Sequence, residues 1–388
     1  MPFAQTLLSL PESPTMHIAF DTYYIQASAI AVGIIWFLSR NRKIDLFPII
    51  AVCAWLIGVC TIYFVYGANQ VNFYSNDQYL HSLITRFYLP YEGFSFNKIV
   101  TFRYLITYPA FLLSKIGLND ILVLKSFQIL SLIGIYFKSK EIIFSNGFSI
   151  KYWHFMFIAS PLMFFFSLLA LRDLTLALFT ICFIFDRGYP RRTFYTVLIF
   201  LLKPHLAIAL LFGILMLLVF KRIRTNLDLI STLVFVFFSY LLGSFSYSIG
   251  TYVKYYFFPG LPTQLLSQSK FFQISLNFSG LQFFSLLNDK NTVVATPTTF
   301  LLLARILLFD TFVIPVSFVI IAIFFLRSLR IEAFVILVSF IFYLGLVSQT
   351  DFNSTRQNIP FMAAMGIISV VNIEAGLQFR RRKVDTQI

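Results

Sequence analysis

Two short motifs place a carboxylate where it could take part in acid–base chemistry. Asp77 lies in the run Asn-Asp-Gln-Tyr-Leu-His that begins at residue 76, and Asp173 directly follows Arg172. A carboxylate beside a hydroxyl can act as a general base, and a nearby guanidinium stabilises negative charge that develops in the reaction. Each motif also has a purely structural interpretation. Asp77 could cap the next helix, and Arg172 with Asp173 could form an ion pair that turns the chain.

Further basic side chains offer contacts to a phosphate or diphosphate. Guanidinium and ammonium groups bind phosphate oxygens strongly, and a histidine can donate to them or relay a proton. The candidates are Arg86, Arg103, Lys203, His205, Arg305 and Arg356, together with Asp351 in the polar loop before Arg356. Anchoring at the membrane surface is the alternative for Arg356, and a structural role is the alternative for His205.

The cysteines give no sign of a metal centre or of a disulfide framework. Cys53, Cys60 and Cys182 all fall inside apolar runs, without the spacing of metal ligands. We therefore expect no cofactor, and a divalent metal is not indicated.

The composition excludes a soluble globular protein. Apolar residues make up 59% of the 388 residues and charged residues 12%, with a mean hydropathy of +0.82, whereas about 25% of an ordinary soluble domain is charged. The net charge of +14 would suggest nucleic acid in a soluble protein, but a surface this apolar requires lipid as its solvent. We expect the lipid bilayer as a partner and no nucleic acid.

Long apolar runs predict an all-α fold, a polytopic transmembrane helix bundle with residues 1–388 in a single membrane domain. Lipid offers no hydrogen bonds to the backbone, so each crossing must be a helix of roughly 17–25 residues. Eleven candidate spans follow from the apolar runs, some of them short: 22–39, 45–67, 119–137, 152–170, 172–186, 193–203, 205–220, 227–247, 303–326, 331–347 and 357–375.

Basic clusters in the short loops and the tail fix the predicted orientation. Lys and Arg gather on the cytoplasmic side, which places the N-terminus outside and the C-terminus in the cytoplasm. The inner clusters are Arg40, Arg42 and Lys43; Lys138, Lys140 and Lys151; Arg187, Arg191 and Arg192; Lys221, Arg222 and Arg224; Arg327 and Arg330; and Arg380, Arg381, Arg382 and Lys383.

The remaining polar segments then lie on the outer side. One predicted hairpin turns at 171–173, and the next turns at 203–205, where proline cannot continue a helix. Two long segments, 68–118 and 248–302, also lie outside, and the first contains a helix that rests on the membrane. Basic residues outnumber acids on this side. Because a charge at membrane depth costs at least about 2.5–3.5 kcal/mol on insertion scales, the excess points to an anionic ligand.

The order of these features resembles the GT-C class of membrane glycosyltransferases, which use polyprenyl-linked sugars on the outer side of the membrane. Asp77 with Tyr79 is similar to the acid-bearing element that opens the first outer loop in that family. The segment 104–125 (YLITYPAFLLSKIGLNDILVLK) resembles its next helices, and the turns at 171–173 and 203–204 resemble its polar hairpin tips. The resemblance covers about residues 45–220. Many members carry two acids in the first outer positions, whereas Asp77 has no adjacent acid, so a metal is not implied.

Length, number of spans and Arg-rich outer loops also resemble the Wzy polymerases, which join undecaprenyl-diphosphate-linked repeat units of bacterial surface polysaccharide. This resemblance implies a glycosyltransferase of O-antigen, capsule or exopolysaccharide assembly in the bacterial inner membrane. Its substrate is a polyprenyl-linked saccharide, and other polysaccharide-assembly proteins are candidate partners.

The roles implied for the site residues follow from that reaction. The catalytic group is Asp77 as general base with Arg172 and Asp173. Lys203 and Arg356 assist Arg172 at the departing phosphate, whereas Arg86 and Arg103 orient the lipid head or the glycan. Two alternatives stay open: a GT-C enzyme that adds one sugar from a polyprenyl-phosphate donor, and a flippase for lipid-linked oligosaccharide.

Cysteine accessibility tests the predicted orientation. After replacement of the native cysteines, single cysteines at Asp77, Arg172 and Lys203 should react in intact cells with a maleimide that does not cross the inner membrane, because these positions face outward. A cysteine at Arg191, in an inner cluster, is the control and should react only after the membrane is broken. Equal protection at the outer and the inner positions would contradict the assignment.

Overall fold

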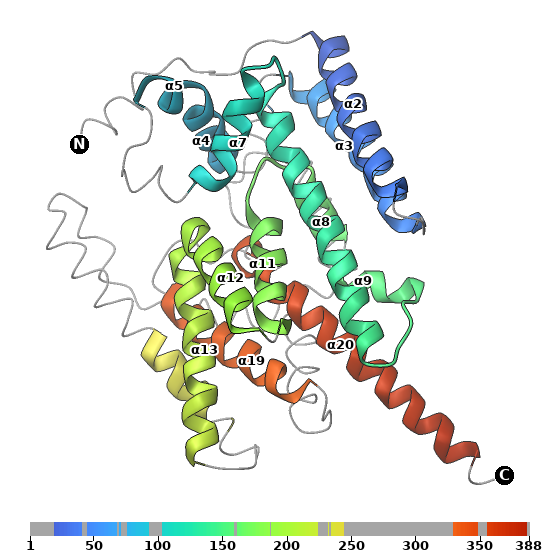
Figure 1. Ribbon diagram of the computed structural model, residues 1–388, viewed down its shortest axis with the longest axis vertical. Coiled ribbons are helices and arrows are strands. Elements are labelled where there is room, and N and C mark those ends of the chain that lie inside the picture. Colours follow the sequence, from blue (N-terminus) through green and yellow to red (C-terminus); the bar gives the residue numbers. More distant parts are fainter. Residues whose placement is uncertain are drawn as a thin grey trace, which may run out of the picture. The chain divides into compact units, whose positions relative to one another are not determined.

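The computed structural model is helical throughout the part of the chain that it describes. It describes residues 19–40, 45–67, 70, 76–92, 103–158, 161–186, 188–223, 232, 234–243, 329–347 and 355–385. These ranges contain helices and turns but no strand, in agreement with the all-α prediction (Figure 1). The chain divides into two compact units, residues 1–134 with 163–175 and residues 135–162 with 176–388.

The first unit is built around a pair of apolar helices, α2 (Phe20–Ser39) and α3 (Leu46–Tyr66), which pack against each other (Figure 1). The rings of Tyr23 and Tyr63 stack with centroids 4.0 Å apart. Shorter helices follow: α4 (Asn76–Leu83), the π-helix η2 (Ile84–Tyr88), α5 (Leu89–Glu92) and α7 (Tyr104–Ser114). The first part of α8 (Asp120–Ser145) and the segment 163–175 complete the unit.

A single glutamine joins α2 to the turn between α7 and α8. Gln26 donates from Nε2 to the carbonyl of Gly117 at 2.9 Å, and its Oε1 accepts from the amide of Asn119 at 2.8 Å. Gly117 has a φ of +91°, which a side chain would make costly. The sharp turn therefore depends on this glycine, and the amide of Gln26 fixes its position.

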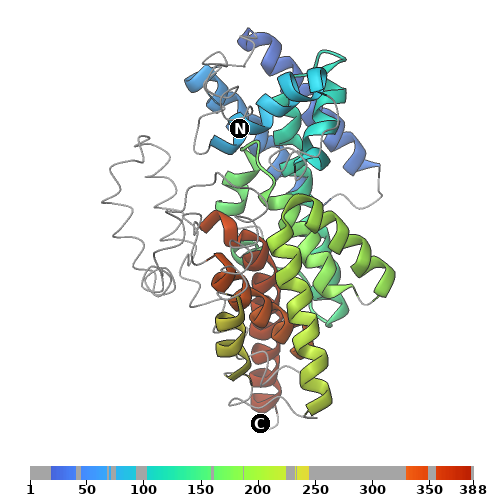
Figure 2. The same cartoon turned by 90° about the vertical axis from the view of Figure 1, so that its left-hand side faces the viewer.

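The second unit consists of helices that pack closely along their length. Its elements are the rest of α8, η3 (Tyr152–His154), α9 (Phe155–Ile158), α11 (Asp173–Phe185) from Leu176 onward, α12 (Tyr189–Leu202), α13 (Pro204–Ile223), α19 (Arg330–Val347) and α20 (Thr355–Asp385). The short helix α10 (Pro161–Ser167) falls at the division between the units. α13 lies against both α12 and α19, as the turned view also shows (Figure 2).

Close approach in this unit relies on small residues. At Gly213 of α13, an added Cβ would lie 2.9 Å from the carbonyl oxygen of Val335 in α19. At Gly366 of α20, it would lie 2.2 Å from the carbonyl oxygen of Phe157 in α9. Small residues let helix backbones approach in a membrane, where packing rather than the hydrophobic effect holds helices together.

Within the described ranges, four helices are long and apolar enough to cross a membrane. They are Phe20–Ser39, Leu46–Tyr66, Asp120–Ser145 and Ile359–Gln378. Shorter apolar helices, including Asp173–Phe185 and Pro204–Phe220, fall at other predicted spans. The chain is thus a helical membrane protein by the length and composition of its helices.

Several predicted breaks agree with the structure. α12 ends before Lys203 and α13 begins at Pro204, as the proline required. α11 begins at Asp173, the predicted turn of the preceding hairpin, and α7 lies in the segment where we predicted a short helix.

Other boundaries differ from the prediction. α8 continues to Ser145, beyond the predicted end at 137, because Lys138 pairs with Glu141 at 2.9 Å and Asp186 at 2.7 Å. The expected span 152–170 contains the short helices η3, α9 and α10, the last of which begins at Pro161. The expected span 303–326 and the outer segment 248–302 lie outside the described residues.

The contact at Gly366 gives a test of the packing. Gly366→Ala should lower the free energy of unfolding by about 1–3 kcal/mol, because a methyl group has no room beside a backbone carbonyl. Thermal unfolding in detergent, followed by loss of the monodisperse peak, measures it. Gly376→Ala on the same helix is the matched control: nothing lies within 4 Å, so the change should be neutral or stabilising by up to about 1 kcal/mol. Equal melting temperatures for the two variants would show that α9 and α20 do not meet as described.

Candidate functional site

The bend before α11 is held by two side chains of α4. Gln78 accepts from the amide of Ala170 through Oε1 at 2.7 Å, and Nδ1 of His81 lies 2.8 Å from the carbonyl oxygen of Ala170. Both side chains are fully buried. Because each satisfies one backbone group of the same residue, α4 fixes the bend from which Arg172 and Asp173 follow.

The start of α11 is fixed on its other side by α8. Gln128 accepts from the amide of Leu174 at 3.2 Å and donates to the hydroxyl of Thr175 at 3.2 Å. Ser131 forms a second hydrogen bond with Thr175, at 2.9 Å. The first turn of α11, with the buried Asp173 at its start, is therefore held from two helices, and the helix N-terminus favours that carboxylate.

Asp77 lies one helical turn before His81 and is partly accessible. A guanidinium nitrogen of Arg103 lies 3.4 Å from Oδ1 of Asp77, and the two side chains are 14% and 33% exposed. This long, partly solvated contact leaves the carboxylate reachable by a ligand. Residues four apart on a helix share a face, so Asp77 and His81 project from the same side of α4.

His81 lies within electrostatic range of three of the predicted site residues. Burial is the main cause that lowers the pKa of His81, and the positive charges of Arg103 and Arg172 act in the same direction, whereas Asp77 acts in the opposite one; the pKa that results is about 3. The imidazole is therefore neutral at physiological pH. The first unit thus gathers Asp77, Arg103 and Arg172 around a neutral buried histidine.

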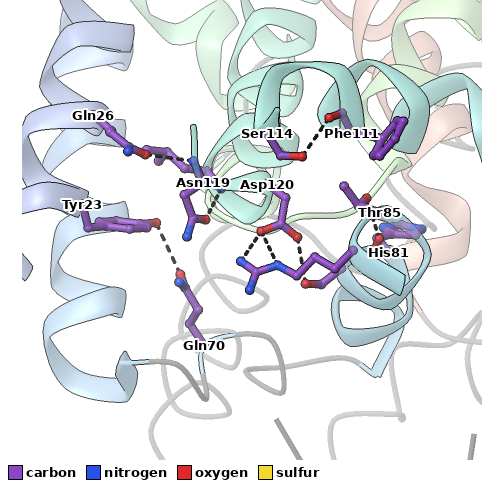
Figure 3. A network of polar contacts seen from close by, with 12 residues as sticks. Tyr23, Gln26, Gln70, His81, Thr85, Phe111, Ser114, Asn119 and Asp120 are labelled. Carbon is purple, nitrogen blue, oxygen red and sulfur yellow. Dashed lines mark hydrogen bonds and ion pairs between the residues drawn. The ribbon is translucent and has the colours of Figure 1, made fainter. Parts of the chain in front are cut away.

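Arg86 belongs to a different, tightly bonded group, which is centred on Asp120. Its guanidinium donates to Oδ1 of Asp120 from Nε at 2.8 Å and from a terminal nitrogen, and Ser82 donates to Oδ2 at 2.8 Å. Figure 3 shows these three bonds as dashed lines that meet at the carboxylate of Asp120. Asp120 is almost completely buried. Arg86 sits in the π-helix η2, a type of turn that is frequent at functional sites, and the pair balances its charge inside the protein.

Lys125 is a buried cation without a carboxylate partner among the described residues. Its Nζ donates to Oε1 of Gln70 at 2.7 Å. The same oxygen accepts from the hydroxyl of Tyr23 at 3.3 Å (Figure 3). The side chain is fully buried, five residues into the apolar helix α8. A charge in such a place marks a functional position more often than an ordinary surface lysine does.

The other predicted residues belong to the second unit or lie outside the described residues. Lys203 and His205 belong to the second unit, where Nζ of Lys203 lies 5.2 Å from the ring centroid of Tyr343 and His205 is exposed. Arg356 lies in the first turn of α20. Arg305 and Asp351 lie outside the described residues. No group of three or more His, Cys, Asp or Glu side chains in the described ranges could hold a metal ion.

Sequence reasoning missed three residues that the structure brings to the site or its support: His81, Asp120 and Lys125. His81 follows Asp77 at helical spacing, which was the available signal. Asp120 carried a signal as an acid at the start of a predicted span. For Lys125 the only signal in the sequence was a basic residue near the start of an apolar run.

Comparisons with known proteins add no family assignment. No family model, no curated protein and no solved structure matches this chain.

The two arginine contacts predict different effects on stability. Arg86→Ala should destabilise the protein by about 3–5 kcal/mol, because it leaves the buried carboxylate of Asp120 without its counter-charge. Arg103→Ala breaks a longer contact to a carboxylate that is one-third exposed, and it should destabilise the protein by less than Arg86→Ala does. Thermal unfolding of both purified variants in detergent measures the difference. The assignment of Arg86 to the fold is wrong if Arg86→Ala melts at the same temperature as Arg103→Ala.

Proposed function

We propose that this chain is a membrane glycosyltransferase of bacterial surface polysaccharide assembly, which joins undecaprenyl-diphosphate-linked repeat units at the outer face of the inner membrane. The observation that supports the proposal is the gathering of Asp77, Arg103 and Arg172 around His81. A partly accessible carboxylate in contact with Arg103 offers a base for a hydroxyl, and Arg172, within electrostatic range of the same histidine, offers positive charge for a phosphate.

Asp77 is the best candidate for the base among the acids of the first unit. Asp120 receives three hydrogen bonds from Arg86 and Ser82, so its oxygens are engaged. Asp173 is 3% exposed at the start of α11. Asp77 is one-third exposed, and its contact to Arg103 is long at 3.4 Å, so a substrate hydroxyl can reach its carboxylate from solvent.

In the proposed reaction, Asp77 accepts the proton of the acceptor hydroxyl while the oxygen forms a bond to the anomeric carbon of the donor sugar. The bond from that carbon to the diphosphate oxygen breaks, and its electron pair leaves with the lipid diphosphate. Arg172 stabilises the charge that develops on this leaving group, and Arg103 holds Asp77 and orients the glycan. Charge stabilisation by fixed donors acts most strongly where water is excluded.

Further residues extend the proposal. Lys203, His205 and Arg356 belong to the second unit, and their contacts to a phosphate remain predictions from sequence. Arg305 and Asp351 remain predictions from sequence. The hydrogen bonds of Arg86 to the buried carboxylate of Asp120 support a structural role for Arg86, in addition to its proposed contact with the lipid head.

The product separates this function from its two alternatives. Loss of a polymerase leaves lipid-linked single repeat units, whereas loss of an enzyme that adds one sugar from a polyprenyl-phosphate donor leaves truncated repeats. A flippase consumes no donor in detergent, where no second compartment exists.

Replacement of Asp77 tests the proposed base. Asp77→Asn keeps the shape of the side chain but removes the proton acceptor, so the rate of sugar transfer should fall by about 10²–10⁴-fold. The measurement is the conversion of lipid-linked single repeats, extracted from a strain that lacks the protein, into longer products by purified protein in detergent. Glu141→Gln is the control, because Glu141 is exposed and pairs only with Lys138 in the described structure; its rate should be unchanged. Full activity of Asp77→Asn would exclude Asp77 as the base.

A further inference from the structure

The imidazole of His81 has one ring nitrogen that no described residue satisfies. The side chain is fully buried, its Nδ1 lies 2.8 Å from the carbonyl oxygen of Ala170, and its Nε2 has no hydrogen-bond partner. Buried polar atoms are nearly always paired, because an unpaired one has lost its bonds to water without replacement. A single orphan in this position therefore requires an explanation.

The contact to Ala170 determines what the orphan atom can do. A carbonyl oxygen only accepts, so Nδ1 must carry the hydrogen and donate it. Since the ring is neutral, Nε2 then carries a bare lone pair and is a hydrogen-bond acceptor. The atom needs a donor such as a hydroxyl or an N–H group.

The charged residues around His81 indicate which kind of ligand could donate a hydrogen bond to Nε2. Arg103 and Arg172 lower its pKa by their charge, so a cationic ligand would meet repulsion. Asp77, one turn earlier on the same face of α4, presents a second acceptor. Two acceptors one helical turn apart suit a neutral ligand that carries neighbouring hydroxyl groups.

We propose that Nε2 of His81 accepts a hydrogen bond from a second hydroxyl of the acceptor sugar, beside the hydroxyl whose proton goes to Asp77. This inference rests on the proposed glycosyl transfer, and it makes His81 a positioning and specificity-determining residue of the acceptor site. Nothing is transferred to His81: a group with a pKa of about 3 is a weak base at neutral pH, and the reaction leaves its ring neutral throughout.

Two substitutions separate this role from a merely structural one. Asn at position 81 retains a donor in the place of Nδ1 and so keeps the bond to Ala170, but it has no atom in the place of Nε2. Gln places its carbonyl oxygen near the position of Nε2 and so keeps an acceptor, but it loses the donor to Ala170. The two variants therefore remove the two functions of the ring one at a time.

The expected results cross over. His81→Asn should melt close to the wild-type temperature. The concentration of extracted lipid-linked repeats at which it reaches half its maximal rate should rise about tenfold, which corresponds to the loss of one hydrogen bond to the substrate. His81→Gln should melt at a lower temperature but keep a half-saturating concentration within about threefold of wild type, well inside the cost of one lost hydrogen bond. The reverse pattern, with His81→Asn fully active and His81→Gln impaired, would overturn the inference and assign His81 to the bend alone.

A binding experiment on the wild-type protein decides the question even if a variant fails to fold. The protein labelled with nitrogen-15 histidine is titrated with the methyl pyranosides of glucose, galactose and mannose, and the Nε2 resonance of His81, identified by its absence in His81→Asn, is followed. At least one of these sugars should shift the resonance, and its deoxy analogue that lacks the bonded hydroxyl should not. No shift with any of the three sugars would overturn the inference.

Failure of the inference and failure of the proposed function give different results. If wild-type protein converts no lipid-linked repeats but its Nε2 resonance responds to a pyranoside, the proposed reaction fails and the hydroxyl site stands. If wild-type protein forms longer products and His81→Asn forms them with the same half-saturating concentration, the reaction stands and the hydroxyl site fails.

Discussion

The two hydrogen bonds from α4 to Ala170 are the contact on which the candidate site depends. Gln78 and His81 satisfy the amide and the carbonyl of one residue in a bend that would otherwise bury both groups unpaired. An apolar bundle offers no water to replace them. The bend is therefore specified by side chains that are 92 and 89 residues away in the sequence, and the same helix carries Asp77. One helix thus both holds the bend that carries Arg172 and presents the partly exposed carboxylate of Asp77.

The buried charged side chains of the first unit differ in the partners that stabilise them. Asp120 is saturated by Arg86 and Ser82, which stabilises the fold but leaves no oxygen for a substrate. Among the described residues, Lys125 has only the amide oxygen of Gln70 as a hydrogen-bond partner, so a neutral group and not a counter-charge holds this buried side chain. Asp77 and Arg103 form an ion pair as Asp120 and Arg86 do, but their contact is longer and the carboxylate is partly exposed. Accessibility of charge, rather than its number, therefore separates the groups that hold this unit together from those that can do chemistry.

The sequence predicted the class of fold and the breaks that depend on local chemistry. Apolar runs gave the helices, and Pro204 and the charged pair at Arg172 and Asp173 gave the turns, because these effects act within a few residues. The end of α8 was missed, since Lys138 is stabilised there by Asp186, a partner far along the chain. Asp77, Arg103 and Arg172 were predicted as separate contacts from their types. Their gathering around His81 depends on long-range hydrogen bonds to Ala170 that no pattern in the sequence encodes.

A second buried histidine shows what a purely structural imidazole looks like in this protein. His154 accepts from the amide of Lys151 through Nδ1 at 3.1 Å, so its Nε2 carries the hydrogen and donates to Glu374 at 3.0 Å. Both of its nitrogens are used, and Lys151 completes the group through its own bonds to Glu374 at 2.6 Å. The fold therefore satisfies a buried histidine completely where the ring only joins helices. His81 is equally buried, yet it keeps one acceptor open beside Asp77. The difference between the two rings is the reason to look for a hydroxyl-bearing ligand at His81 and not at His154.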